Sequence, residues 1–111
     1  MTIQTVKNSI KHVANVYGFN AYDDPYAVFM RIAEPDTNYL EISIYPDTDW
    51  SKPEQTTILH FSVKVTSPDK RLSPEEMLKY ADIIHRGAEM VMELEELHLS
   101  YTMSYTEEDN D

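Results

Sequence analysis

The sequence predicts one α+β domain of two layers, in which two helices pack against a three-stranded antiparallel meander with a possible fourth strand. Three observations lead to this fold class. Two segments repeat apolar residues at the spacing of one helical face. Between them, apolar and polar residues alternate as they do in half-buried strands. The chain has 111 residues, of which 41% are hydrophobic, and this size and composition suit a single core.

The first helix is expected over residues 2–17, because its apolar residues recur along one face. Gly18 then provides the stop signal, since glycine commonly follows the last turn of a helix. The residues of the expected inner face are Ile3, Val6, Ile10, Val13 and either Val16 or Tyr17. A polar turn is expected over 20–25.

Three strands are expected over 26–33, 39–45 and 56–66, and Pro35 marks the end of the first. Their short connections predict an antiparallel meander. Alternation places one set of apolar side chains toward the helices: Leu40, Ile42, Ile44, Leu59, Phe61, Val63 and Val65.

The second helix is expected to begin after Ser73 and to run to Glu96. Ser73 can cap the helix, Pro74 suits its first position, and Glu76 can complete a capping box. The inner face is predicted to consist of Met77, Tyr80, Ile84, Ala88 and Val91. Alternation over 99–106 fits a short fourth strand. The domain is therefore expected to span 1–106, followed by a loose acidic tail over 107–111.

The bulk composition excludes several classes of function. Cysteine is absent, so disulfides and thiolate chemistry are excluded. The formal net charge of −11 argues against direct binding to nucleic acid or to an anionic membrane. The N-terminus lacks the apolar core of a signal peptide, and no stretch reaches the length of a membrane span. A cytoplasmic protein is the resulting expectation.

No motif in the sequence predicts catalysis, a metal site or a cofactor. The four histidines do not form a close metal-ligand motif. Gly18 and Gly87 are the only glycines and stand alone, which excludes a glycine-rich phosphate loop. No nucleophile motif is present either. We therefore expect a protein that is not an enzyme.

The acidic residues are concentrated near the end of the chain. Residues 1–74 hold nine acids and seven bases, whereas residues 75–111 hold eleven acids and two bases. Negative charge in the last turns of a helix is unfavourable because of the helix dipole. The predicted binding residues for a basic partner are Glu89, Glu93, Glu95 and Glu96 of the helix and Glu107, Glu108 and Asp109 of the tail. The alternative is a solvated face with a solubilising tail.

Trp50 lies in a polar loop between the second and third expected strands. A tryptophan in this setting either folds back on the sheet or is offered to a partner. We expect the first, and we keep Trp50 among the candidate partner-binding residues for the second.

The acids over 89–96 and 107–111, placed after a helix–strand–strand–strand–helix order, resemble those of small acidic inhibitors carried by phages and mobile elements. These include anti-CRISPR and other DNA-mimic proteins. The resemblance implies a protein that occupies a basic nucleic-acid-binding surface of a larger protein.

The same element order also resembles that of small acidic secretion chaperones, although the chain stops before their further strands and last helix. This second resemblance implies a homodimer, or an adaptor that binds peptide segments through its sheet.

Overall fold

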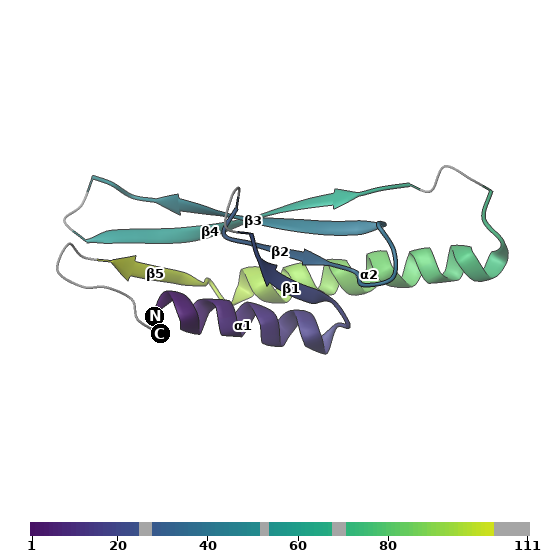
Figure 1. The fold of residues 1–111 in the computed structure, drawn as a ribbon, viewed down its shortest axis with the longest axis horizontal. Coiled ribbons are helices and arrows are strands. Elements are labelled where there is room, and N and C mark those ends of the chain that lie inside the picture. The colour runs from purple at the N-terminus through teal and green to yellow at the C-terminus, as the bar shows by residue number, and fades with distance from the viewer. Residues whose placement is uncertain (25–27, 52–53, 68–70, 104–111) are drawn as a thin grey trace.

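The computed structural model describes residues 1–24, 28–51, 54–67 and 71–103. Two helices lie on one side of a five-stranded sheet, and the molecule is elongated, with extents of 57 × 23 × 22 Å (Figure 1). The elements are, in chain order, α1 (Ile3–Val16), β1 (Asn20–Asp23), β2 (Met30–Ala33), β3 (Leu40–Thr48), β4 (Gln55–Val65), α2 (Pro74–Glu96) and β5 (Ser100–Met103).

The sheet has the strand order β1-β2-β3-β4-β5, and all neighbouring strands are antiparallel. The long β3–β4 hairpin forms its centre, with Leu40 opposite Val65 at one end and Thr48 opposite Thr57 at the other. The sheet curls, so that both edge strands contact α1. The antiparallel α+β class predicted from the sequence is confirmed.

The ends of α1 follow the local signals of the sequence. The Thr5 N–H donates to the Thr2 hydroxyl over 3.1 Å at the start of the helix. At its end Gly18 adopts φ 82°, a left-handed conformation that favours glycine. The Phe19 N–H then donates to the carbonyl of Ala14 over 2.9 Å, which satisfies a carbonyl of the last turn. The predicted stop at Gly18 is confirmed.

Both ends of α2 were also predicted correctly. The Glu76 N–H donates to the Ser73 hydroxyl over 3.2 Å, and the Ser73 N–H donates to the Glu76 carboxylate over 3.3 Å. These two bonds are the predicted capping box. The helix ends at Glu96, and His98 follows with φ 48°.

The core lies between the sheet and the two helices, and its largest fully buried side chains come from α1, β2, β3 and α2. They are Val6, Ile10, Met30, Ile32, Ile42, Ile44, Ile83, Met90 and Leu94. The guanidinium of Arg86 joins the two helices at the rim of this core. It donates to the carbonyl of Tyr17, lies 5.2 Å from the centre of the Phe19 ring, and bonds to Asp82 over 2.8 Å.

The sheet has more strands than the sequence predicted. The expected turn over 20–25 is wrong for Asn20–Asp23, which form the edge strand β1. This strand buries no side chain fully, so it lacks the alternation by which strands are recognised. The fourth strand suggested by the alternation is present as β5, over Ser100–Met103. Of the first predicted strand, 26–33, only Met30–Ala33 is a strand among the described residues. Residue 25 of the predicted turn and residues 26–27 and 104–106 of the predicted strands lie outside the described residues.

The predicted inner face of α2 is only partly right, because Ile84 and Val91 pack against the core as half-buried side chains but do not form its centre. The helix buries Ile83, Gly87, Met90 and Leu94, whereas Met77 is 57% exposed and Ala88 is also exposed. Two apolar stripes run along this helix, and helical spacing alone does not rank them. The stripe with Gly87 is the buried one because glycine permits the close approach of Leu40. A Cβ atom at Gly87 would lie 2.0 Å from Cδ2 of that leucine.

Candidate protein-binding surfaces

The predicted acidic cluster of α2 divides between two sides of the helix. Glu89, Glu93 and Glu96 lie near Tyr17 at the end of α1, and we call these three residues the acidic face. Burial raises the pKa of the Tyr17 hydroxyl above its ordinary value of 10.0, and the negative charge and hydrogen bonding of Glu93 raise it further. The charges of Glu89 and Glu96 act in the same direction. The three carboxylates therefore create one region of negative potential.

Glu95 lies on the other side of α2, toward β4. It lines a hollow of about 390 Å³ together with Leu94, His98 and residues of β4 that include Phe61. A single partner surface that covers the acidic face does not cover Glu95. The structure thus brings together three of the four predicted helical acids and separates the fourth.

The positive charges of the domain leave the acidic face largely without counter-ions. Glu89 pairs with His85, whereas Arg86 pairs with Asp82 instead. Among the described residues, neither Glu93 nor Glu96 forms an ion pair. All three side chains of the acidic face are exposed.

The prediction that Trp50 folds back on the sheet is wrong, because the residue is 74% exposed. It lines an open hollow of about 500 Å³ with Asp47, Asp49 and Ile58 near the β3–β4 turn. Figure 1 shows this turn at one end of the molecule and the start of α2 at the other. The three predicted tail residues, Glu107, Glu108 and Asp109, lie outside the described residues.

One edge of β4 is open over most of the strand. β5 pairs only with Gln55–Ile58, so among the described residues Leu59–Val65 has no strand beside it on that side. Val63 and Val65 lie on the helix-facing side, opposite Ile42 and Leu40, as the alternation predicted. Each valine is nevertheless 48% exposed. We call residues 59–65 the open edge.

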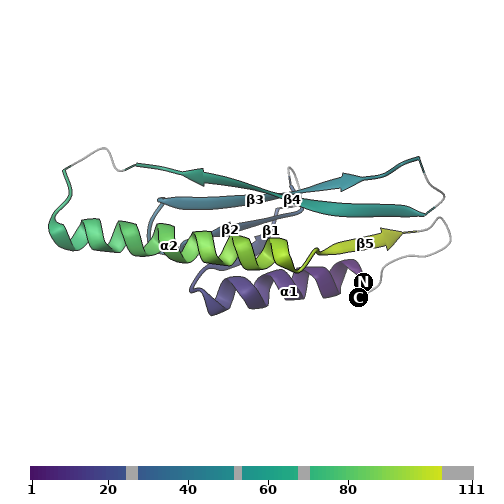
Figure 2. The same cartoon turned by 180° about the vertical axis from the view of Figure 1, so that it is seen from behind.

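The open edge lies beside the second apolar stripe of α2. The residues of this stripe precede Glu95 at helical spacing and therefore lie on the same side of α2 as Glu95. The side chain of Glu95 lines the hollow with β4. We call it the open stripe, and its members are Met77, Ile84, Ala88 and Val91. Ile84 and Val91 are half-buried, whereas the other two are exposed. Figure 2 shows the molecule from the side on which β4, β5 and α2 lie nearest the viewer.

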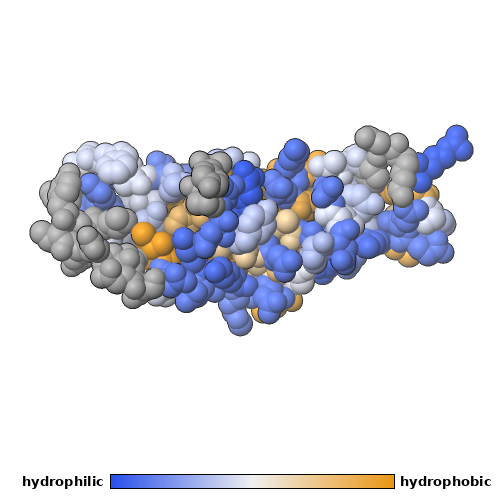
Figure 3. Space-filling view, viewed as in Figure 1, coloured by the Kyte–Doolittle hydropathy of each residue, from blue (hydrophilic) through white to orange (hydrophobic). Residues whose placement is uncertain are grey.

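The side of the molecule seen in Figure 3 is mainly hydrophilic, and its apolar residues appear there as small, separate areas.

On the outer face of the sheet, Arg31 bonds to Asp24 over 2.6 Å and to Glu41 over 2.9 Å. The bond to Asp24 is the main cause of a raised Arg31 pKa. The single guanidinium thus joins two carboxylates of different segments, so this network has a structural role.

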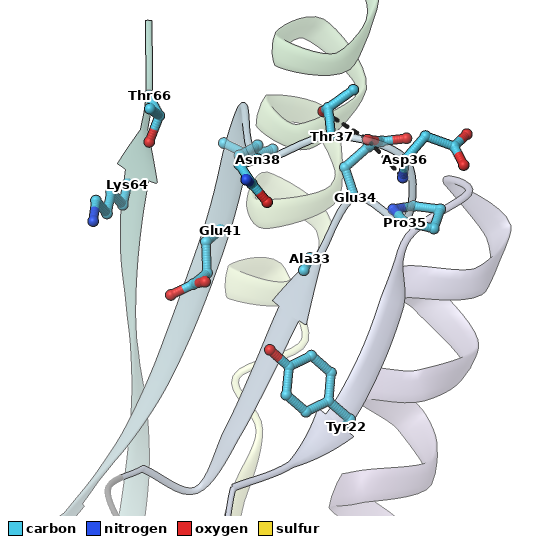
Figure 4. Close-up of a pocket in the computed structure, with 11 residues that line it drawn as sticks. Tyr22, Ala33, Glu34, Pro35, Asp36, Thr37, Asn38, Glu41, Lys64 and Thr66 are labelled. Atoms are coloured by element: carbon cyan, nitrogen blue, oxygen red, sulfur yellow. Dashed lines mark hydrogen bonds between the residues drawn. The ribbon is translucent and has the colours of Figure 1, made fainter. Parts of the chain in front are cut away.

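The hollow beside the β2–β3 connection has a volume of about 490 Å³ and a polar lining (Figure 4). Its one buried carboxylate, Glu34, accepts bonds from the Asp36 N–H over 3.1 Å and from the Thr37 hydroxyl over 2.7 Å. Both bonds hold the turn that connects β2 and β3, so Glu34 has a structural role.

Within the described ranges, no three histidine or carboxylate side chains are placed to hold a metal ion. No helix in this part of the chain is long and apolar enough to cross a membrane. The chain matches no family model, no curated protein and no solved structure.

The sequence pattern assigned neither the open edge nor the open stripe to particular residues, because both depend on which strands and helices become neighbours in the fold.

Proposed function

We propose that this protein is a non-catalytic binding module whose acidic face takes up a basic surface of a larger protein. The observation that carries this proposal is the arrangement of Glu89, Glu93 and Glu96 around Tyr17. They stand in the final turns of α2, where the helix dipole disfavours negative charge. No basic residue occupies the last turn of this helix. A cationic partner would supply the missing counter-charge.

The spacing of the acidic face suits a surface that otherwise binds nucleic acid. Carboxylates three or four positions apart on a helix stand about 5 to 6 Å apart, which is comparable with the phosphate spacing of a nucleic-acid strand. The resemblance to phage-type DNA mimics adds support from composition. The proposed activity is thus competition with nucleic acid for a basic surface, as in an inhibitor.

The test replaces the acidic face while controlling for net charge. The Glu89→Gln, Glu93→Gln, Glu96→Gln triple variant is compared with a Glu54→Gln, Glu75→Gln, Glu95→Gln variant that loses the same charge elsewhere. The probe is a fluorescent deca-lysine peptide, followed over about 50 to 200 mM salt, a range in which contacts between exposed charges weaken. We expect at least a tenfold loss of affinity for the first variant and less than threefold for the second.

Equal losses in the two variants would mean that only net charge matters, and the acidic face would then have no special role. Thermal unfolding of both variants shows whether either one has lost its fold.

A second candidate function is supported by the open edge. An adaptor that binds an extended segment adds that segment as a strand to a sheet edge and reads its side chains in adjacent pockets. The side of Leu59–Val65 away from β3 has no strand beside it within the described residues, and together with the neighbouring hollow it provides such an arrangement. This candidate differs from the first in its response to salt, because apolar contacts strengthen the complex regardless of charge.

A further inference from the structure

The outer end of the β3–β4 hairpin is held in the sheet by hydrogen bonds. The Asp49 N–H donates to the carbonyl of Thr56 over 3.0 Å. The hydroxyls of Thr48 and Thr57, which lie opposite each other on the two strands, are 2.7 Å apart. Trp50 follows Asp49 directly, so its backbone is anchored by this bonded pair of strands.

This end of the hairpin carries an open hollow of about 500 Å³. We call it the Trp50 hollow, and its lining residues are Asp47, Thr48, Asp49, Trp50, Thr56 and Ile58. Trp50 is 74% exposed and Ile58 is 56% exposed, although both side chains are large and apolar. Within the described ranges, the Trp50 ring forms no ring stacking and no cation contact. Tryptophan is enriched at the centres of protein interfaces, so the Trp50 hollow is a candidate docking site.

Two carboxylates give the Trp50 hollow negative charge. Nε2 of His60 lies 3.1 Å from Oδ2 of Asp47. Oδ1 of Asp49 accepts bonds from the Ser51 N–H over 3.0 Å and from the Ser51 hydroxyl over 2.5 Å. These bonds orient the two carboxylates before any partner binds, which lowers the entropic cost of binding. Residues 47–54 hold three acids and one base, so a cationic group is complementary to this end of the hairpin.

The apolar walls of the Trp50 hollow select among cationic groups. The face of a tryptophan ring attracts a cation more strongly than other aromatic faces do. A guanidinium is planar and weakly hydrated, stacks on aromatic rings, and bonds to carboxylates through a rigid fork. A lysine ammonium is a compact and strongly hydrated charge, so it gains less from the Trp50 ring. The methylene groups of an arginine also cover apolar surface such as that of Ile58.

We propose that the Trp50 hollow binds an arginine side chain of another protein. The guanidinium lies against the indole ring and directs its N–H groups toward Asp47 and Asp49, while the methylene groups pack on Ile58. A single contact between exposed charges is weak. The Trp50 hollow is therefore one anchor point within a larger contact surface.

The arginine comes from another protein and not from a second copy of this chain. Two of the three arginines are engaged within the domain, because Arg31 bonds to two carboxylates and Arg86 bonds to Asp82. The third, Arg71, is exposed just before the start of α2, whereas the β3–β4 turn lies at the opposite end of the molecule (Figure 1). A second copy that offered Arg71 would make a head-to-tail contact, which continues from copy to copy instead of closing.

The Trp50 hollow is separate from the acidic face. The β3–β4 turn lies beyond the end of α2 in both ribbon views (Figures 1 and 2). None of the described residues that line the hollow belongs to α2. The proposal therefore does not depend on the acidic face, and either one can fail without the other.

The first experiment records proton–nitrogen correlation NMR spectra of the labelled protein. Trp50 is the only tryptophan, so the spectrum holds one indole signal. The probe is a capped pentapeptide of glycine and serine with a central arginine, compared with peptides that carry lysine, leucine or citrulline there. Citrulline keeps the shape of arginine without its charge. We expect the arginine peptide to shift the signals of Trp50, Thr56 and Ile58 and to bind about threefold more tightly than the lysine peptide. The leucine and citrulline peptides should give no saturable shift.

The second experiment tests the aromatic ring. Trp50→Leu keeps an apolar side chain but removes the aromatic face. Tyr22→Leu is the matched control, because Tyr22 is an aromatic residue on β1 that is 44% exposed and does not line the hollow. We expect Trp50→Leu to bind the arginine peptide about threefold more weakly, measured on the amide signals of Thr56 and Ile58, and Tyr22→Leu to bind it unchanged.

The third experiment tests the carboxylates at constant net charge. In the Asp47→Asn, Asp49→Asn variant each asparagine keeps an oxygen that can accept hydrogen bonds. The Asp23→Asn, Asp36→Asn variant loses the same charge elsewhere and is the control. We expect about a threefold loss of affinity for the arginine peptide in the first variant and no loss in the second. The spread of the amide signals shows that each variant remains folded.

Equal shifts from the arginine and citrulline peptides, or unchanged binding by Trp50→Leu, would overturn the proposal. Equal affinities for the arginine and lysine peptides would overturn it as well, because only charge would then be recognised. So would shifts confined to the amide signals of the acidic face. The Glu89→Gln, Glu93→Gln, Glu96→Gln variant should leave the indole shift unchanged, which separates this proposal from that of the acidic face.

A last outcome concerns the source of the arginine. An indole signal that moves with the concentration of the protein alone, and that no longer does so in Arg71→Ala, would overturn the assignment to another protein. We expect an indole signal that does not depend on protein concentration.

Discussion

The two flanks of α2 differ in the side chains that they expose. The flank toward α1 carries the acidic face, whose negative charge raises the pKa of Tyr17. The flank toward β4 carries the open stripe, beside a strand edge that no other strand covers in the described part of the chain. Between them lies the buried row with Met90 and Leu94. Only the middle row is buried by the domain itself. On one flank the acidic face is not paired with the nearby Arg86, which bonds to Asp82, and on the other flank the apolar side chains remain partly or fully exposed.

The largest expected effect on stability comes from comparing the fully buried Met90 with the exposed Met92, two positions further along α2. Met90→Ala should lower the free energy of unfolding by about 2 to 5 kcal/mol, because Met90 is fully buried and its loss leaves a cavity. Met92→Ala should change it by less than about 0.5 kcal/mol, since Met92 is 62% exposed. Urea denaturation measures both values. Similar losses in the two variants would contradict the assigned faces of α2.

A second pair of adjacent positions tests the close approach of helix and sheet. Gly87→Val should cost about 1 to 3 kcal/mol, because its side chain would overlap Leu40 in the core. Ala88→Val places the same side chain on the open stripe, where we expect a loss of about 0.5 kcal/mol from helix propensity alone. Denaturant midpoints compare the two. If Gly87→Val were as stable as Ala88→Val, α2 would not be held against Leu40.

The acidic face should lower the free energy of unfolding by a smaller amount. Two Glu→Gln variants at opposite ends of α2 can measure it. Glu96→Gln should stabilise the protein by about 0.3 to 1 kcal/mol, since it removes a negative charge from the C-terminal end of the helix. Glu75→Gln should destabilise it by a similar amount, because Glu75 lies in the first turn. Thermal unfolding at low salt gives both signs. The same sign for both would exclude the helix dipole as the cause.

The smallest effect concerns pH and distinguishes the α1 flank from the rest of the surface. The raised pKa of Tyr17 means that the folded state keeps the proton where the unfolded state begins to lose it. This contribution is fully present below the ordinary pKa of 10.0 and is lost as pH rises through the folded-state value. Tyr17→Phe should therefore flatten the alkaline decline of stability. Tyr45→Phe, on the outer face of the sheet, is the control for loss of one hydroxyl.

Much of the fold could be predicted because its signals are local. The Ser73 capping box and the Gly18 stop depend on a few adjacent residues, and both are present. β1 could not be predicted, because its pairing with β2 is not encoded in its own alternation. Five strands therefore form where three, with a possible fourth, were expected.

The candidate surfaces were only partly predictable. Helical spacing correctly placed Glu89, Glu93 and Glu96 near one another, but it could not show that Glu95 would face β4. The exposure of Trp50 depends on whether the sheet provides a place for its ring, and no local pattern encodes this. The tail acids remain a prediction.

The sequence by itself determined the helix boundaries, the antiparallel α+β class and the excess of acids in the last third of the chain. These properties follow from caps, alternation and composition, which act over short separations. Only the tertiary structure decided which stripe of α2 is buried, because that choice depends on Gly87 meeting Leu40 across the core. It also decided that the pairing of β5 with β4 ends at Ile58, since strand pairing joins residues far apart in the chain.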